Sequence, residues 1–213
     1  MDADAPILPP DIDAGFRRFR SGRYAEARER YLRLGTEGQR PSVAVIACSD
    51  SRSAPEMVFD AGPGELFVIR NIGGLVPAYE PDGRSHAASA ALEYAVLALG
   101  VGHIVVLGHG RCGAIAAALA AFDPLSATDF VGTWIRGLRD IAAELDPTAW
   151  PDAAGRQHEL ELRSVEQSLA NLRTFPWIRE RERSGTVDLH GAWFDIALGE
   201  LDALSPEGWA TIR

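Results

Sequence analysis

The sequence predicts an α/β fold in which a central, mostly parallel sheet is flanked by helices, with an N-terminal helical arm and a late edge strand. Short, continuous apolar segments rich in β-branched residues lie at 42–47, 66–69 and 103–107. Such segments are typical of strands that are buried on both faces of a parallel sheet. Ala- and Leu-rich segments alternate with them, and this alternation indicates right-handed crossover connections.

The start of the chain differs from this pattern. Residues 1–10 are predicted to be a flexible tail, and residues 11–35 are predicted to be a helical arm. Phe16 and Phe19 lie three residues apart among Arg and Glu residues, as on one face of a helix. The arm packs either on a partner subunit or on its own domain, and the pattern leaves both open. The sequence has no internal repeat and no low-complexity linker, so we expect a single domain over residues 1–213.

The later elements are predicted from the spacing of apolar residues and from local composition. A stripe of apolar residues within 85–99 predicts a buried helix, and residues 112–121 predict a second helix of small residues. Residues 160–172 carry a further amphipathic pattern. Residues 186–198 have a β-like composition and predict a late edge strand or hairpin.

Two polar motifs come directly after predicted strands. The motif CSDSR begins at Cys48, and the motif GHGRCG contains His109 and Cys112. Open α/β sheets bind ligands at the carboxyl ends of their strands. If the strands at 42–47 and 103–107 are neighbours, the two thiols and the imidazole converge. Two thiolates and one imidazole form a good tetrahedral zinc set with one position left over.

The two cysteines also have other interpretations. A single cysteine after a strand is most often a small buried apolar residue. A redox pair is disfavoured because Cys48 and Cys112 lie far apart in the sequence and neither belongs to a CxxC motif. The chain's only two cysteines both lie at strand ends beside polar, Gly-rich loops, and this placement favours zinc.

Asp50 and Arg52 lie two residues apart in the first motif, a spacing that permits a bidentate ion pair. On an ordinary surface such a pair contributes little to stability. Beside a metal, Asp50 either takes the fourth coordination position or leaves the metal and accepts a hydrogen bond from a metal-bound water. Arg52 would hold Asp50 in the released state.

Taken together, CSDSR, GHGRCG, FVIRN at 67–71 and ALEYAV at 91–96 resemble the β-class carbonic anhydrase family. The closest match runs over residues 39–113, and LHGAWFDIALGEL at 189–201 is also similar. The resemblance implies a lyase, carbonate dehydratase, that uses one Zn²⁺ per chain. Its reaction is the reversible hydration of carbon dioxide to bicarbonate and a proton by attack of zinc-bound hydroxide.

The resemblance also assigns roles to individual residues. It implies that the zinc ligands are Cys48, His109 and Cys112 and that Asp50 and Arg52 form a catalytic dyad. The residues that it implies for substrate binding are Gln39, Phe67, Ile72, Tyr94 and Gly113. Phe67, Ile72 and Tyr94 also fit simple core packing. The implied assembly is a homodimer or homotetramer, with some pocket residues contributed across the dimer interface.

Composition excludes several classes of partner and chemistry. The 30 acidic residues exceed the 21 basic ones, for a net charge of -9, so we expect neither nucleic-acid nor membrane binding. All the basic residues are Arg, which excludes chemistry that depends on Lys. With so few cysteines and no long apolar segment, the expected location is the cytoplasm.

Two other functions compete with carbon dioxide hydration. A relative that hydrolyses carbonyl sulfide or carbon disulfide would keep the same zinc ligands. A non-catalytic zinc-binding module is disfavoured, since it would not require Asp50, Arg52 and Gln39.

Overall fold

A computed structural model describes residues 7–120 and 123–212 of the 213-residue chain. Its contacts divide the chain into two compact units, Met1–Gln39 and Arg40–Arg213. Within the predicted tail, residues 1–6 lie outside the described residues, and Pro10 already begins a helix. The prediction of a single domain over 1–213 stays a prediction.

The first unit is helical, as predicted for the arm. It consists of α1 (Pro10–Ser21), α2 (Arg23–Glu26) and α3 (Arg28–Glu37). Pro10 occupies the first position of α1, where its missing N–H is not needed. The rings of Phe19, Tyr24 and Tyr31 pack on one another, with the Tyr24 and Tyr31 centroids 5.1 Å apart. The aromatic residues of the arm therefore form a small cluster within this unit.

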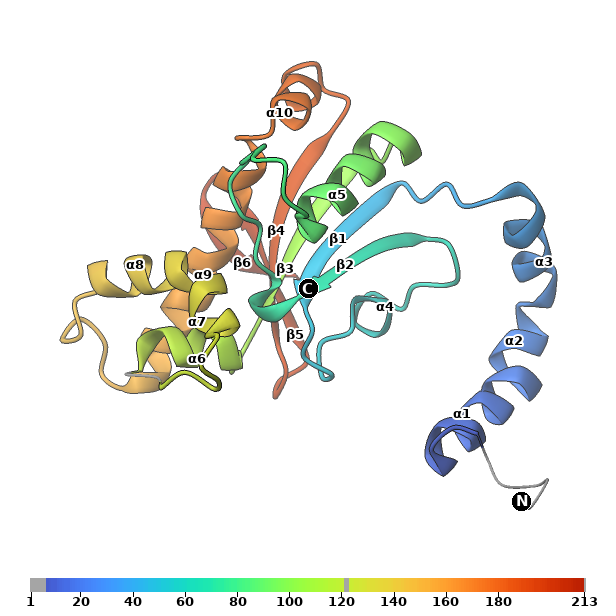
Figure 1. Ribbon diagram of the computed structural model, residues 1–213, viewed down its shortest axis with the longest axis horizontal. Helices are drawn as coiled ribbons and strands as arrows, with labels where there is room; N and C mark the ends of the chain where they lie inside the picture. The colour runs from blue at the N-terminus through green and yellow to red at the C-terminus, as the bar shows by residue number, and fades with distance from the viewer. Residues whose placement is uncertain (1–6, 121–122, 213) are drawn as a thin grey trace. The chain divides into compact units, whose positions relative to one another are not determined.

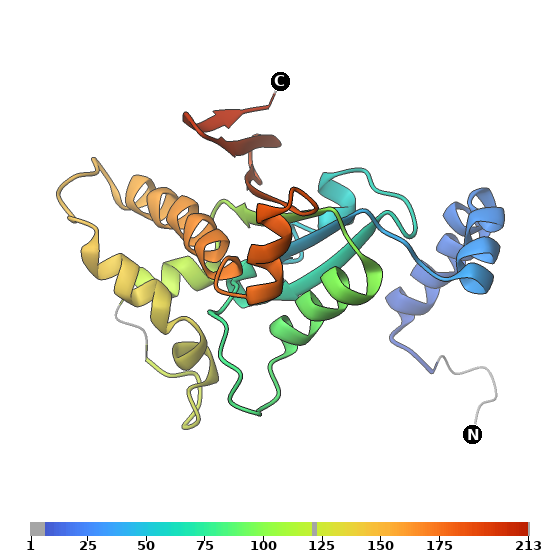
Figure 2. The same ribbon diagram turned by 90° about the horizontal axis from the view of Figure 1, so that it is seen from above.

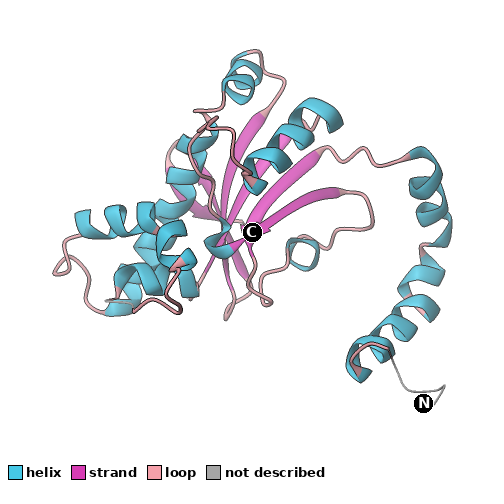
Figure 3. Ribbon diagram, viewed as in Figure 1, coloured by secondary structure: helices cyan, strands magenta, loops and turns pink. Residues whose placement is uncertain are grey.

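The second unit is an α/β sandwich built on a twisted sheet (Figures 1 and 3). Its elements up to the third strand are β1 (Val43–Cys48), α4 (Pro55–Val58), β2 (Leu66–Asn71), η1 (Ile72–Gly74), α5 (Ala87–Glu93), η2 (Tyr94–Leu99) and β3 (His103–His109). The helices that follow are α6 (Gly113–Leu119), α7 (Phe130–Trp134), α8 (Arg136–Glu144), α9 (Ala153–Leu172) and α10 (Pro176–Arg183). The chain then forms β4 (Asp188–Asp195), β5 (Glu200–Ser205) and β6 (Gly208–Thr211).

Within the described residues the strands form one sheet in the order β2-β1-β3-β4-β5-β6. Strands β2, β1, β3 and β4 are parallel, whereas β5 and β6 are antiparallel. The predicted mostly parallel sheet is therefore confirmed. The segment 186–198 holds β4, which pairs with β3 on one side and turns back to pair with β5 on the other. The hairpin alternative is thus the correct one for this segment, and the edges of the sheet are β2 and β6.

Helices cover the sheet on the side where its largest apolar cluster lies. Helix α9 packs on β3 and β4, and α5 packs on β2 (Figure 2). Ile46, Ile104 and Leu172 are among the fully buried residues of this cluster. Helix α9 approaches β4 closely because Gly191 has no side chain, and a Cβ there would lie 3.0 Å from Val165. The predicted helix within 85–99 is confirmed, although its last turns, η2, are π-helical.

The topology places two strand ends side by side. From β1 the chain crosses to β2 on one side, and from β3 it crosses to β4 on the other. This reversal opens a crevice between the carboxyl ends of β1 and β3, where α/β sheets bind ligands. In the part of the chain that the structure describes, no helix is both long and apolar enough to cross a membrane.

Candidate metal centre

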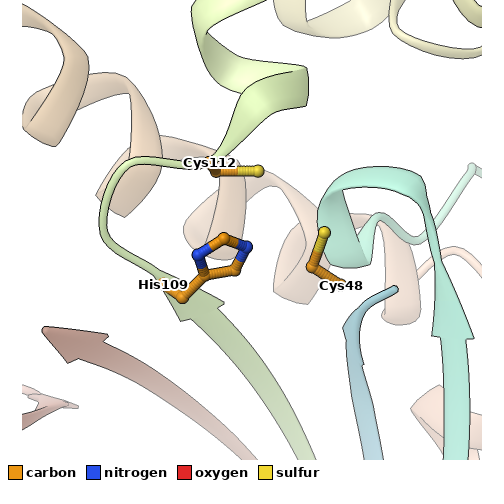
Figure 4. Close-up of side chains that lie close together, drawn as sticks. All are labelled: Cys48, His109 and Cys112. Carbon is orange, nitrogen blue, oxygen red and sulfur yellow. The ribbon is translucent and has the colours of Figure 1, made fainter. Parts of the chain in front are cut away.

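The crevice between β1 and β3 brings together the three predicted zinc ligands (Figure 4). Cys48 is the last residue of β1, His109 is the last residue of β3, and Cys112 immediately precedes α6. Their ligating atoms all lie within 4.8 Å of one another, and all three residues are buried. The expected convergence of the two motifs therefore holds, because β1 and β3 are neighbours in register.

The orientation of His109 fits a metal ligand. Its Nδ1 lies 2.9 Å from the carbonyl oxygen of Gly110 and donates to it, which leaves the lone pair on Nε2. Nε2 is buried and, within the described residues, has no hydrogen-bond partner. A buried imidazole nitrogen without a partner is costly unless something binds it. Beside two sulfur atoms, the donor set fits Zn²⁺.

The two thiols share hydrogen bonds in a way that favours one thiolate. The Cys112 thiol lies against Cys48, and Cys48 also lies beside His109 and accepts from the backbone N–H of Gly73 at 3.3 Å. The hydrogen bond from Cys112, together with that from the Gly73 N–H, lowers the pKa of Cys48 to about 4, whereas hydrogen bonding to Cys48 together with burial raises the pKa of Cys112. Burial lowers the pKa of His109, but the Cys48 sulfur and the Gly110 carbonyl outweigh it and raise the pKa overall. The site therefore holds a proton that a zinc ion would displace.

Asp50 and Arg52 form the predicted bidentate pair at the edge of the site. Arg52 Nε lies 2.9 Å from Asp50 Oδ1, and Arg52 Nη2 lies 2.7 Å from Asp50 Oδ2. The Arg52 backbone N–H also donates to Oδ1 at 2.9 Å. These hydrogen bonds hold the pKa of Asp50 well below its usual range. Asp50 Oδ2 lies 4.0 Å from His109 Nε2, so an ionised carboxylate borders the space between the ligands.

Arg70 fixes the backbone of this loop with its side chain, and the backbone carbonyl of Arg111 contacts Arg52. Arg70 donates from Nε to the Cys48 carbonyl at 3.0 Å and from Nη2 to the Asp50 carbonyl at 2.6 Å. Arg111 contributes its carbonyl oxygen, which lies 3.3 Å from Arg52 Nη2. Arg111 has a positive φ of 56°, a conformation that is rare for a residue with a side chain. The loop conformations of both motifs are thus connected through Arg52.

Comparison with known proteins identifies the family. The family model described as carbonic anhydrase matches residues 43–201, a range that begins in β1 and ends in β5. A carbonic anhydrase of Pseudomonas aeruginosa is 41% identical over 196 residues, which cover 91% of this chain and 86% of that protein. This chain belongs to the β-class carbonic anhydrase family.

Solved structures of family members share the fold. The β-carbonic anhydrase CcaA superposes with a TM-score of 0.83 at 29% identity, covering 95% of this chain and 91% of that one. A structure from work on two tetrameric β-carbonic anhydrases of Sordaria macrospora superposes with a TM-score of 0.77 at 29% identity, covering 95% of this chain and 98% of that one. The likeness to both structures extends over nearly the whole chain.

The residues predicted to bind substrate in this family member lie in different places. Ile72 lines a cavity of about 620 Å³ together with Ser49 and Trp134. Phe67 and Tyr94 do not line that cavity, and their rings instead pair with each other at 6.0 Å. Their assignment to the pocket stays a prediction.

The remaining two substrate positions also stay predictions. Gly113 begins α6 next to Cys112, and open space surrounds the position that a Cβ would occupy. Gln39 is the last residue of the first unit.

Sequence reasoning missed a buried carboxylate behind the metal centre. Glu161 of α9 is only 3% exposed. Its Oε1 accepts from the backbone N–H of Cys112 at 3.1 Å and from Gln157 Nε2 at 2.9 Å, and its Oε2 accepts from Trp193 Nε1 at 3.1 Å. Glu161 therefore positions the backbone of a metal ligand. The sequence signal was only a charged residue within an apolar helical pattern, which does not reveal which way it points.

A pair of glycines was missed as well. Gly73 and Gly74 both have positive φ, and their segment passes directly beside Cys48. A Cβ at Gly74 would lie 2.9 Å from the backbone nitrogen of Cys48, which is too close for any side chain. The Gly-Gly dipeptide after β2 is the sequence signal that could have found this close approach.

Proposed function

We propose that this chain catalyses the reversible hydration of carbon dioxide to bicarbonate and a proton, with one Zn²⁺ per chain held by Cys48, His109 and Cys112. The observation that carries the proposal is the convergence of these three buried ligands beside the ionised Asp50. Membership of the carbonic anhydrase family agrees with it. A non-catalytic metal site would need the three ligands but not the Asp50–Arg52 pair.

The zinc ion would supply an acidic water. Bound zinc lowers the pKa of water to about 7 and so provides a nucleophile at neutral pH. The chain's own contribution is to fix the ligands from a rigid sheet. His109 is oriented by the Gly110 carbonyl and Cys112 by Glu161. Partners of this kind hold metal ligands in place before the ion arrives.

Asp50 acts as the acceptor for the attacking water. Because Arg52 lowers the pKa of Asp50, the carboxylate is ionised throughout the neutral range. Oδ2 borders the site, where it would accept a hydrogen bond from the hydroxide that a bound zinc ion would supply and so orient that nucleophile. The alternative role of Asp50, as a fourth metal ligand, requires the carboxylate to leave both nitrogens of Arg52.

Carbon dioxide needs a small apolar pocket beside this acceptor. The mostly apolar cavity of about 620 Å³ lined by Ile72, Ile69 and Val131 also includes Ser49, the residue between Cys48 and Asp50, and we propose that carbon dioxide enters through it. In this proposal, Phe67 and Tyr94 line a pocket that a partner subunit completes. Gly113 and Gln39 complete the proposed set, Gly113 by its backbone and Gln39 by orienting substrate or bicarbonate through hydrogen bonds.

We further propose a homodimer or homotetramer that works in the cytoplasm. The related enzymes of Sordaria macrospora are tetrameric. In the helical arm, Ile12, Phe16 and Leu32 are at least half exposed, and such apolar side chains favour association. Sedimentation analysis of the purified chain measures the assembly directly.

Stopped-flow hydration kinetics test the proposed reaction. We expect zinc-loaded wild type to hydrate carbon dioxide and Asp50→Asn to be strongly impaired while it still binds zinc. Asp146→Asn is the matched control, because Asp146 is exposed and interacts only locally with Thr148. Carbonyl sulfide and carbon disulfide are assayed alongside. A zinc-loaded wild type that hydrolyses a sulfur analogue but leaves carbon dioxide unreacted would overturn the proposal.

A further inference from the structure

A second cluster of metal-ligating side chains lies at the amino ends of β3 and β4. It consists of His103, Asp188 and His190, whose ligating atoms lie within 4.8 Å of one another. The catalytic ligand His109 is at the other end of β3. At about 3.3 Å per residue, the length of that strand separates the two clusters by about 20 Å. The cluster is therefore independent of the metal centre described above.

The sheet itself holds the cluster together. In the parallel register, His103 lies opposite Asp188, and Val105 lies opposite His190. Side chains alternate along a strand, so Asp188 and His190 point to the same face of the sheet as His103. Neighbouring strands in a sheet lie about 4.8 Å apart, which puts paired side chains within reach of one ion. The three ligands are thus brought together by strand pairing rather than by a mobile loop.

The distances between the ligand atoms suit one metal ion. His103 Nδ1 lies 3.3 Å from His190 Nε2 and 3.6 Å from Asp188 Oδ2. Ligands that bind a tetrahedral ion at about 2.0–2.1 Å lie about 3.3–3.4 Å from one another. Two of the three distances are therefore close to those around a bound ion, and the third is within 4.8 Å. About half of each of the His103 and Asp188 side chains is exposed, at 47% and 64%, so water can complete the coordination.

The donor types point to a class of ion. Two imidazoles with one carboxylate suit borderline divalent transition metals, whereas Mg²⁺ and Ca²⁺ prefer oxygen ligands only.

We propose that His103, Asp188 and His190 form a second metal site, which takes one divalent transition-metal ion such as Zn²⁺ or Ni²⁺ per chain. An ion there joins β3 to β4 and stabilises the folded chain by mass action. The competing explanation is a hydrogen bond between the two histidines beside a surface carboxylate, with no ion involved.

Calorimetric titration of the protein with Ni²⁺ tests the second site, after one zinc per chain has been bound and excess metal removed. We expect wild type to take up one further ion per chain. His190→Gln should bind Ni²⁺ at least tenfold more weakly than wild type. The Ni²⁺ affinity of Asp188→Asn should lie between those of wild type and His190→Gln. His86→Gln is the matched control, because His86 is a partly exposed histidine whose ring, among the described residues, contacts one carboxylate, that of Asp82 at 2.6 Å.

Nuclear magnetic resonance of the imidazole nitrogens provides a second readout on wild type alone. Paramagnetic Ni²⁺ should broaden the signals of His103 and His190 before those of His86. Wild type that binds no second ion would overturn the proposal, as would equal binding by wild type and His190→Gln. Because the first of these outcomes is measured on wild type, the test does not depend on the folding of any variant.

Discussion

Replacing Glu161 by Gln tests whether the buried carboxylate positions the metal centre. The carboxylate accepts three hydrogen bonds, from Cys112, Gln157 and Trp193, and it is almost fully buried. Glutamine has nearly the same shape but offers only one acceptor oxygen. Whichever way the new amide turns, its NH₂ group faces a buried donor.

The expected loss of stability follows from the one buried donor that no longer has an acceptor. A buried hydrogen-bonding group that loses its partner costs about 1–3 kcal/mol, so the free energy of unfolding of the zinc-free protein should fall by that amount. Outer partners of metal ligands typically contribute 10–100-fold to metal affinity. We therefore expect Glu161→Gln to bind zinc about 10–100-fold more weakly, because the Cys112 backbone is no longer held and a nearby negative charge is lost.

Two measurements and one control decide the question. Zinc affinity is measured by competition with a chelator, and stability is measured by urea denaturation of the zinc-free protein. Glu159→Gln is the matched control on the same helix, since in the described part of the chain Glu159 pairs with the exposed Arg163 at 2.6 Å. Such pairs contribute about 0–1 kcal/mol. If Glu161→Gln and Glu159→Gln bind zinc equally well, Glu161 does not position the site.

Three other substitutions test separate parts of the account. Arg52→Lys should slow stopped-flow carbon dioxide hydration by roughly 10–100-fold, because an ammonium loses at least one charge-assisted hydrogen bond of the bidentate pair; an unchanged rate would contradict this role. Gly74→Ala should lower the free energy of unfolding by about 1–3 kcal/mol in urea, since its Cβ meets the Cys48 backbone at positive φ, whereas Gly137→Ala on an open helix face should not. Cys112→Ser should greatly reduce the rise in melting temperature that a single equivalent of zinc gives wild type, because only the exposed second site could then bind the ion, and a rise of equal size would refute the ligand assignment.

The sequence predicted the four parallel strands and the polar motifs at their ends, but not the strands β5 and β6. The apolar segments before Cys48 and His109 predicted buried parallel strands, and strand order then determined that the two motifs meet. Zinc was predicted because the only two cysteines and a histidine all follow strands beside polar, Gly-rich loops. The 186–198 segment was less certain, because its composition does not distinguish an edge strand from one that lies inside the sheet.

Features that depend on tertiary contacts were not predictable. Glu161 lies in a helix with several other glutamates, and only the approach of α9 to the Cys112 backbone singles it out. His103 and His190 come together through a strand register that no local pattern encodes. The sequence indicates only that Arg70 lies in a strand, whereas the structure shows that it donates to two loop carbonyls.

X-ray absorption at the zinc edge, on wild type loaded with a single equivalent of zinc, tests the central claim most directly. The account predicts two sulfur ligands at about 2.3 Å, with nitrogen or oxygen ligands at about 2.0–2.1 Å completing a four-coordinate shell. A shell without sulfur, or with only one, would show that Cys48, His109 and Cys112 do not together hold the metal.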